Sequence, residues 1–515
     1  MRVATWNVAA VNQNPFEYWL THPDPEYTRL MQAVEHFILQ PGEQDVAVGS
    51  VFSDGMFADL KARMAAEGWA GVAETEALWQ ADFCKRRIVT GFLKDASLGK
   101  KRLASMPDRF TNTITAADGS SHPRPAVINS FTGPMRSTAE WWAQWLAFFF
   151  DTPLELAGRD GRPARKRPVE LLVPIIRQKY PDVSEEEERI SLPLQLLCLA
   201  LFDAILVHVL NTLAPSSWLP LKQQLVETLI VGKLERTAEL IGRTHASVDV
   251  FCVQEASAAL ARLLEQQLAP SRFVVLPESL DPSRDQNSIV VLSASSFKRD
   301  SVREVTADVR ALAPGCGLAP GDLLAFTVRG TGGEAGAPGA TYLVASFHGD
   351  TNGLQTADVV AALGEYGARE ADAGRPLALI VGLDANTYLN ADGTLDGAKF
   401  YLAERFGVDC SAAGLLNCWP AEARWAGALT TYNARTYLQP QLNKAVQHAH
   451  MAARGDRNPK DHILCSAGAF ELSGCTRDNT GANSYPHELV LPGLGFPSDH
   501  CIVIAELAPL TRGRG

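Results

Sequence analysis

The sequence lacks cysteine pairs of the kind that bind zinc or staple small secreted domains. It has 515 residues and nine cysteines, but no CxxC pair and no Cys/His zinc spacing. Cys198, Cys252 and Cys501 lie in strongly apolar segments, where free buried thiols are expected. No charged segment followed by an apolar one precedes the first strand-like residues, so no secretion signal is expected. These absences favour a reducing compartment and an intracellular protein, cytoplasmic or nuclear.

The sequence also lacks an excess of basic residues and an internal repeat. Its formal net charge is −11, which argues against general attraction of the surface to nucleic acid or anionic lipid. A local basic groove remains open, as does a site whose negative charge is offset by a metal ion. The composition is ordinary for a globular protein, and the length predicts two or three structural units.

One apolar run, residues 192–213, is long enough to be tested as a membrane span. A spanning helix needs about 20 apolar residues. Pro193, Asp203 and His208 interrupt the run, and an acidic residue inside a membrane is costly. We therefore expect a buried helix and no membrane span.

The two halves of the chain differ in pattern. A β-rich run at residues 3–8 precedes a long stretch with helical periodicity. Helices are expected at 16–39, 56–68, 138–150, 169–179 and 221–241. After residue 248 the pattern becomes α/β. Strands are expected at 248–253, 273–276, 288–292, 323–328, 342–347, 377–381, 461–466 and 501–507.

Polar or ionisable residues stand at the ends of several expected strands. They are Asn7, Glu255, His348, Asn352, Asp384, Asn386, Asp461, Asp499 and His500. Polar residues at strand ends can converge on one sheet edge, where loops form a cleft. Carboxylates and amides suit Mg²⁺ or Mn²⁺, an Asp can take a proton from water, and a His can steady a phosphate oxygen. Because a single Asp at a strand end is more often a cap or turn former, the ordered set carries the prediction.

These residues occur in the order Trp-Asn, Gln-Glu, His…Asn, Gly-x-Asp-x-Asn, Asp-His-Ile and Ser-Asp-His. That order resembles the endonuclease/exonuclease/phosphatase (DNase I-like) family over residues 2–8 and about the last half of the chain. The resemblance implies a four-layered α/β sandwich, with two packed β-sheets flanked by helices. It also implies phosphoester hydrolysis that depends on a divalent metal.

The resemblance implies a metal-binding half of the site. Glu255 would be the principal ligand of Mg²⁺ or Mn²⁺, with Asn7 orienting it or touching the metal. Asp499 would lie next to the metal. Asp384 would position or deprotonate the attacking water, with Asn386 beside it on the phosphate or the metal. Whether one or two metals bind stays open, because Ala9 stands where some nuclease members carry an Asp.

The resemblance also implies a phosphate-binding half. His348 and His500 would contact the scissile phosphate, and Asp461 would hold the His500 imidazole in one tautomer. Asn352 would contact a phosphate oxygen. Arg435 is a candidate phosphate clamp by its bidentate geometry, with an ordinary surface loop as the alternative. A partner that orients His348 is open among Asp285, Gln286 and Asn287.

The spacing of the first two motifs predicts a large insertion. About 240 residues separate Asn7 from Glu255, more than an ordinary domain. We expect residues 1–8 and 245–515 to form the catalytic domain and residues 9–244 a mainly helical insertion. Selection of substrates and a structural or partner-binding role are equally open for the insertion.

Three functions compete. The leading hypothesis is a phosphodiesterase that acts on a nucleic acid or nucleotide by metal-assisted water attack. The second is a phosphatase or phosphodiesterase for an inositol phosphate or a phospholipid headgroup. The third is a non-catalytic binding protein with the same fold, which would have no need of the full acid, amide and histidine set.

Overall fold

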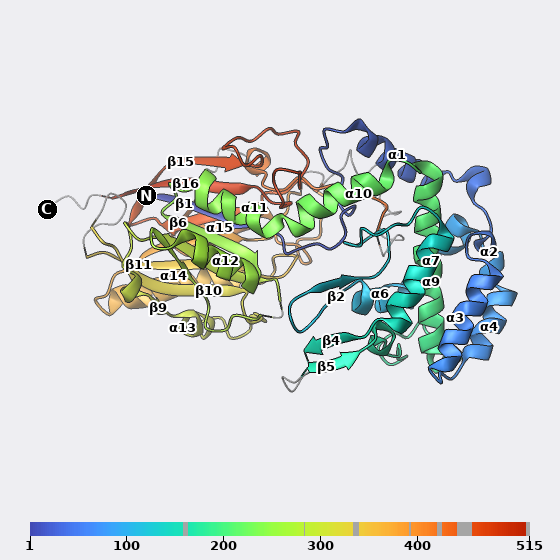
Figure 1. The fold of residues 1–515 in the computed structure, drawn as a ribbon. Coiled ribbons are helices and arrows are strands. Elements are labelled where there is room, and N and C mark those ends of the chain that lie inside the picture. Colours follow the sequence, from blue (N-terminus) through green and yellow to red (C-terminus); the bar gives the residue numbers. More distant parts are fainter. Residues whose placement is uncertain are drawn as a thin grey trace. The chain divides into compact units, whose positions relative to one another are not determined.

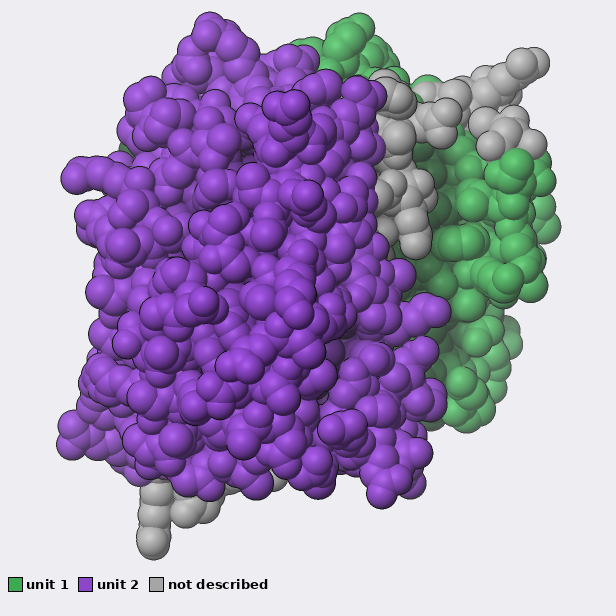
Figure 2. All heavy atoms as spheres, turned by 90° about the vertical axis from the view of Figure 1, so that its right-hand side faces the viewer, with its two compact units in different colours: residues 1–11, 231–434, 455–515 green, residues 12–230, 435–454 purple. Residues whose placement is uncertain are grey.

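The computed structural model describes residues 1–157, 163–282, 284–332, 339–390, 393–419, 425–439 and 456–510. The chain forms two compact units, coloured separately in Figure 2. Unit 1 comprises residues 1–11, 231–434 and 455–515, and unit 2 comprises residues 12–230 and 435–454. The second part of unit 1 therefore begins at Val231. The expected start of the second part of the catalytic domain is residue 245.

Unit 1 contains two six-stranded sheets. The first has the order β15-β16-β1-β6-β8-β7 and consists of β1 (Arg2–Asn7), β6 (Val250–Ala256), β7 (Arg272–Val275), β8 (Asn287–Ser293), β15 (Phe470–Asp478) and β16 (Ile502–Pro509). The second has the order β13-β14-β12-β11-β10-β9 and consists of β9 (Arg303–Glu304), β10 (Leu323–Arg329), β11 (Thr341–His348), β12 (Ala378–Asp384), β13 (Leu415–Asn417) and β14 (Asp461–Ser466). In Figure 1, β1 lies beside β16 and β6, although the three are far apart in sequence.

The two sheets pack face to face. Val3 and Val253 of the first sheet share one buried cluster with Val344 and Ile380 of the second. The sheets approach each other closely at Gly382, where an added Cβ would lie 2.5 Å from the Cβ of Cys252. A glycine is needed there because no side chain fits between the two backbones.

Helices cover the outer face of each sheet. Leu260 and Leu264 of α12 (Ala258–Leu268) belong to the cluster that contains the first sheet. Val360 of α14 (Thr356–Asp372) and Phe406 of α15 (Ala403–Ala412) pack on the second. Unit 1 also contains the short helices α11 (Lys233–Glu239) and α13 (Thr306–Arg310). The predicted four-layered α/β sandwich is confirmed (Figure 1).

Strand register brings the polar strand ends together. The parallel pair β1–β6 places Asn7 opposite Gln254. The parallel pair β11–β12 places His348 opposite Asp384, and the antiparallel pair β12–β14 places Asp384 opposite Asp461. Because the carboxyl ends of parallel strands meet at one sheet edge, these side chains converge there.

Unit 2 is mainly helical, as predicted for the insertion. Its α-helices are α1 (Pro25–Leu39), α2 (Val48–Val51), α3 (Asp54–Ala66), α4 (Val72–Ala81), α5 (Ala96–Lys100), α6 (Ser105–Thr111), α7 (Thr138–Leu146), α8 (Glu185–Arg189), α9 (Ser191–Leu213) and α10 (Trp218–Val226). Two small hairpins accompany them, β2 (Thr113–Thr115) with β3 (Ser121–Pro123), and β4 (Leu154–Ala157) with β5 (Pro163–Lys166).

Two predicted helices of this unit begin or end elsewhere. The helix predicted at residues 16–39 begins at Pro25, because the Asp24 side chain caps it and accepts a hydrogen bond from the Glu26 amide. The prediction of a helix at residues 169–179 is wrong. The structure has only one short 3₁₀ turn there, Pro168–Leu171. Pro174 lies inside that range, and a proline in a helix interior removes a hydrogen bond and clashes with the preceding turn.

Helix α9 contains the apolar run at residues 192–213. Among the described residues it is the one helix long and apolar enough to cross a membrane, and 78% of its apolar window is buried inside the protein. The fully buried Asp203 of this helix forms an ion pair with the equally buried Arg124. The interruptions in the apolar run therefore belong to the interior of unit 2, as the sequence predicted.

Candidate functional site

Asn7, Glu255 and Asp384 meet at the sheet edge. Asn7 Nδ2 donates to Asp384 Oδ2 at 2.9 Å and to Glu255 Oε1 at 3.2 Å. The three residues come from β1, β6 and β12, so strands of both sheets contribute. One neutral amide therefore holds two carboxylates close together.

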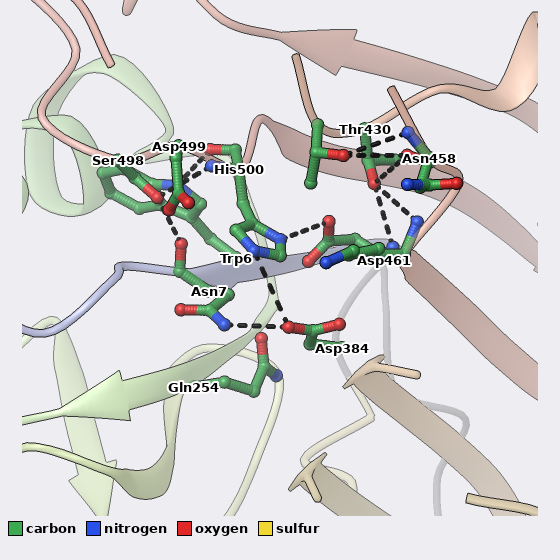
Figure 3. A network of polar contacts seen from close by, with 12 residues as sticks. Trp6, Asn7, Gln254, Asp384, Thr430, Asn458, Asp461, Ser498, Asp499 and His500 are labelled. Carbon is green, nitrogen blue, oxygen red and sulfur yellow. Dashed lines mark hydrogen bonds and ion pairs between the residues drawn. The ribbon is translucent and has the colours of Figure 1, made fainter. Parts of the chain in front are cut away.

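Two histidines face these carboxylates. Nε2 of His348 lies 3.6 Å from Glu255 Oε1 and 3.6 Å from Asp384 Oδ2. Nε2 of His500 lies 3.8 Å from Asp384 Oδ2, while its Nδ1 is 2.8 Å from Asp461 Oδ2. In Figure 3 the His500 ring lies between Asp461 and Asp384.

Backbone contacts fix the orientation of His500. The His500 carbonyl accepts from Trp6 Nε1 at 2.9 Å, and the Ser498 hydroxyl donates to the Asn7 carbonyl at 2.6 Å. Thr430 joins the same network, because its hydroxyl accepts the Asp461 amide at 3.0 Å. Its carbonyl accepts the amide of Cys501, the residue after His500.

Three residues of the site loops have a left-handed backbone. The φ angles of Ala9, Glu255 and Asn386 are 50°, 53° and 47°. Such angles are uncommon outside glycine and are held by the surrounding structure, often at functional sites. Glu255 lies where the pairing of β6 with β8 shifts register, between Val253 and Ala256. Such an irregularity interrupts the regular alternation of side chains along a strand.

The cluster is buried on one side and reachable on the other. Side-chain exposure is 1% for Asp384 and 8% for His500, against 21% for Glu255 and 13% for His348. Solvent or a ligand therefore reaches the site from the side of Glu255 and His348.

Neighbouring charges in the cluster shift the pKa values of His500 and Asp384 in opposite directions, so that both charged forms are stabilised. Burial lowers the pKa of His500, but the charges of Asp461 and Asp384 outweigh it and raise that pKa to about 10. Burial raises the pKa of Asp384, but the positive charges of His500, His348 and Lys460 hold that pKa below its usual value. At neutral pH the site therefore contains an imidazolium beside a carboxylate.

The oxygen atoms of the cluster suit a hard divalent cation such as Mg²⁺. Glu255 and Asp384 are two carboxylates against one amide, so a cation beside them would offset their repulsion. Asp461 Oδ1 is buried and has no hydrogen-bond partner among the described residues. The cluster therefore keeps one buried carboxylate oxygen that no described residue uses.

A second grouping within the cluster also meets the spacing for a metal. Ligand atoms of Asp384, Asp461 and His500 lie within 4.8 Å of one another. In this grouping, Nδ1 of His500 and Oδ2 of Asp461 already bond to each other at 2.8 Å. Glu255, Asn7 and Asp384 form an alternative set of oxygen ligands, and Asp384 belongs to both sets.

The remaining predicted residues occupy different positions. Asp499 accepts from Asn433 Nδ2 at 3.3 Å and contributes to the raised pKa of His500. Asn386 donates its amide to Asp384 Oδ1 at 2.9 Å. Asn352 lies beside Gly353, whose Cα approaches the Asn386 carbonyl so closely that an added Cβ would be 2.5 Å from it. All three lie in unit 1.

Arg435 is assigned to unit 2, unlike the other predicted site residues. Its guanidinium lies 3.0 Å from Glu17 and faces the ring of Tyr18, and both of these residues belong to unit 2. The phosphate-clamp role of Arg435 stays a prediction.

His348 has a neighbour that the sequence analysis did not propose. The His348 amide donates to the Asp322 carbonyl at 2.9 Å, and the charge of His348 acts on the Asp322 carboxyl. Among the three predicted candidates, Asn287 uses its side chain to hold the loop at Asp281 and Arg284. Asp322 precedes β10, with no motif around it to mark it in the sequence.

Two lysines flank the cluster and were also missed. Lys460 is buried, and the charges of Asp456 and Asp384 outweigh burial and hold its pKa above the usual value. Lys233 is buried at the start of α11 and donates to the Ala9 and Ala10 carbonyls. The position of Lys460 directly before the Asp461 motif could have indicated that it lies near the site. Lys233 belongs to a helical stretch that contains no motif of this kind.

Comparisons with known proteins agree with this architecture. Residues 231–500 match the Endonuclease/Exonuclease/phosphatase family, and residues 45–223 match a domain of unknown function (DUF8234). A search of the curated proteins finds no match.

Among solved structures, humanized TDP2 of D. rerio is 12% identical over 55% of this chain and 95% of that chain, with a TM-score of 0.34. The human Nocturnin catalytic domain is 14% identical over 55% and 90%, with a TM-score of 0.34. The mannosyl-6-phosphatase of Bacteroides thetaiotaomicron is 15% identical over 54% and 91%, with a TM-score of 0.34. With a family match over more than half of its length, the chain belongs to the endonuclease/exonuclease/phosphatase family and has a largely helical region inserted after its first strand.

Proposed function

We propose that this protein is a Mg²⁺- or Mn²⁺-dependent phosphodiesterase that uses water to cleave a nucleic acid or nucleotide. The observation that carries the proposal is the joint placement of a cluster of oxygen ligands and an oriented imidazolium. The oxygen ligands come from Asn7, Glu255 and Asp384. The imidazolium is that of His500, which Asp461 orients. A binding module would need no such pairing of acid and base.

Each side chain has a definite task in this reaction. Glu255, Asn7 and Asp384 would hold the cation, which when bound polarises a phosphoryl oxygen and offsets charge on the leaving group. Asp384 remains a carboxylate at neutral pH, so it accepts a hydrogen bond from the attacking water and orients it. His500 donates from Nε2 toward charge that develops on the phosphate, because Asp461 holds its Nδ1.

The surroundings of the site favour a nucleotide-like substrate. The Arg457 guanidinium stacks 3.6 Å from the centre of the Tyr432 ring. Tyr432 follows Thr431, which forms a β-bridge with His500, so the stacked pair is near the cluster in unit 1. A cation beside an aromatic ring suits a phosphate that carries a base. The net charge of −11 disfavours a long nucleic-acid track, which needs many phosphate contacts.

An activity screen tests the proposal. The purified chain is incubated with Mg²⁺ or Mn²⁺ and single- or double-stranded DNA, RNA, nucleotides, inositol phosphates or sphingomyelin, with His500→Ala as the matched inactive variant. We expect cleavage of a nucleic acid or nucleotide that EDTA abolishes. Cleavage of only inositol phosphates or sphingomyelin would move the substrate to the second hypothesis. Absence of turnover with every substrate would favour a binding protein.

A further inference from the structure

Lys233 occupies a position that local physical chemistry disfavours. It is the first residue of α11 and is only 5% exposed. Burying an ammonium group costs free energy, so groups nearby must offset that cost.

The compensation comes from the loop after β1 and from acidic groups. The ammonium donates to the carbonyl oxygens of Ala9 and of Ala10, the latter at 3.3 Å. Burial lowers the pKa of Lys233 to about 8, against the charges of Asp499, Glu255 and Asp285, so the group stays mostly protonated at pH 7. Lys233 thus joins α11 to the loop that follows Asn7.

That loop contacts two of the three side chains proposed to hold the cation, Asn7 and Glu255. The Ala9 amide donates to Asn7 Oδ1 at 2.8 Å, and the Ala10 amide donates to Glu255 Oε2 at 2.9 Å. Ala9 has a φ of 50°, which costs free energy for a residue other than glycine. An anchor on the carbonyls of both residues would therefore keep this loop in a conformation that it would not hold alone.

We propose that Lys233 is a positioning residue, which fixes the Ala9 and Ala10 peptides so that Asn7 and Glu255 keep the geometry that binds the divalent cation. The inference rests on the proposed function, because it assumes a cation at that place. Lys233 is buried and donates to the backbone of the loop, so it would act through Asn7 and Glu255. Its effect should appear in metal affinity before it appears in turnover.

Direct Mn²⁺ binding, measured by electron paramagnetic resonance of the free ion, tests the proposal without any substrate. Loss of a group that orients metal ligands typically weakens metal affinity about 10- to 100-fold. We expect that loss in Lys233→Met, whose side chain has similar length but no donor. Lys233→Arg keeps the charge and the donors and should recover most of the affinity. The exposed Lys298 of the same unit supplies the control, and Lys298→Met should bind Mn²⁺ as the wild type does.

Two further readouts separate positioning from simple destabilisation. The rate of hydrogen exchange in a peptide covering residues 1–11 should rise in Lys233→Met. Without the lysine the loop becomes more mobile, and the Ala9 and Ala10 amides then bond less often to Asn7 Oδ1 and Glu255 Oε2. With a substrate from the activity screen, turnover of this variant should return toward the wild-type value at saturating Mn²⁺. If Lys233→Met does not fold, Lys233→Gln, which keeps one donor, should show the same losses to a smaller degree.

The outcomes distinguish two failures. If the wild type binds no Mn²⁺, the proposed metal-dependent function fails and this inference fails with it. If the wild type binds Mn²⁺ and a folded Lys233→Met binds it equally well, the positioning role alone is overturned. Equal losses in Lys233→Met and Lys233→Arg would overturn it too, because the donors and the charge would then not matter.

Discussion

Both units bury ionisable side chains, but they satisfy them differently. In unit 2 the guanidinium of Arg124 donates to Asp203, Asp108 and Thr111, and Trp145 Nε1 donates to Asp203. This network is closed, since each charged group has partners at hydrogen-bond distance. These charged groups therefore have no need of hydrogen bonds from a ligand.

The buried cluster of unit 1 is open by comparison. His348 and His500 lie 3.6 and 3.8 Å from Asp384 Oδ2, beyond ordinary hydrogen bonds, and Asp461 Oδ1 has no partner among the described residues. Burial of charge is therefore a poor guide to function by itself. The distinction lies in the two charged networks themselves: the charged groups around Arg124 are all paired, whereas the cluster of unit 1 keeps a carboxylate oxygen without a partner among the described residues.

The largest expected effect is on the closed network. Asp203→Ala removes the main partner of a fully buried guanidinium and should destabilise unit 2 by about 3–5 kcal/mol. Denaturant unfolding followed by tryptophan fluorescence measures this loss. The variant's Mn²⁺ affinity, measured below its unfolding midpoint, should remain that of the wild type. A drop in affinity of the folded variant would break the comparison.

His500→Ala should show the opposite pattern. Removing one donor aimed at charge in the transition state typically lowers the rate about 10²–10³-fold. The unfolding midpoint should change less than the rate does, because the buried ring lies among polar side chains and its truncation opens no large apolar cavity. Steady-state kinetics and thermal unfolding measure both. A variant that loses stability while keeping its rate would place His500 among the structural residues.

The Asp461 and His500 pair should behave as one unit. Asp461→Asn removes the charge that holds the imidazolium and should lower the rate through His500. Combined with His500→Ala it should add little, which corresponds to a coupling free energy of about 0.5–3 kcal/mol. A double-mutant cycle on kcat/KM measures the coupling, and additive losses would contradict the proposed pairing.

The last expected effect concerns the pH dependence of unit 2, through Lys222. Burial holds its pKa well below the usual value, with Asp203 as the one charge opposing the shift. The unfolded chain therefore binds a proton that the folded chain does not, and stability should rise with pH until the unfolded lysine also loses its proton, near about pH 10.4. Thermal unfolding at pH 7 and pH 9.5 measures this slope. Lys222→Met should flatten it, and an unchanged slope would assign the effect to another group.

The central part of unit 1 could be predicted from the sequence for a physical reason. Asn7, Glu255 and Asp384 each end a strongly apolar strand, and strand ends in a parallel pairing meet at one edge. Features that depend on tertiary context could not be predicted. Lys233 lies in a helical stretch, and only the folded chain places its ammonium on the Ala9 carbonyl.

Strand β15 was missed as well, and its sequence gives the reason. It contains Ser473-Gly474-Cys475, where the pairing with β16 shifts register, so the apolar alternation that marks a strand is interrupted. The helix predicted at residues 169–179 failed because periodicity was given more weight than Pro174. In both places a local irregularity decided the structure.

The position of β1 between β16 and β6 determines when the site can form during synthesis. Asn7 is synthesised about 250 residues before Glu255 and about 490 residues before His500. During that interval the first strand has neither neighbour, and unit 2 can fold in the meantime as a unit of its own. A nascent chain that stops before β16 would therefore contain most of the side chains of the site and still lack the strand that holds His500. The activity should arise only after β16 has been synthesised and paired with β1.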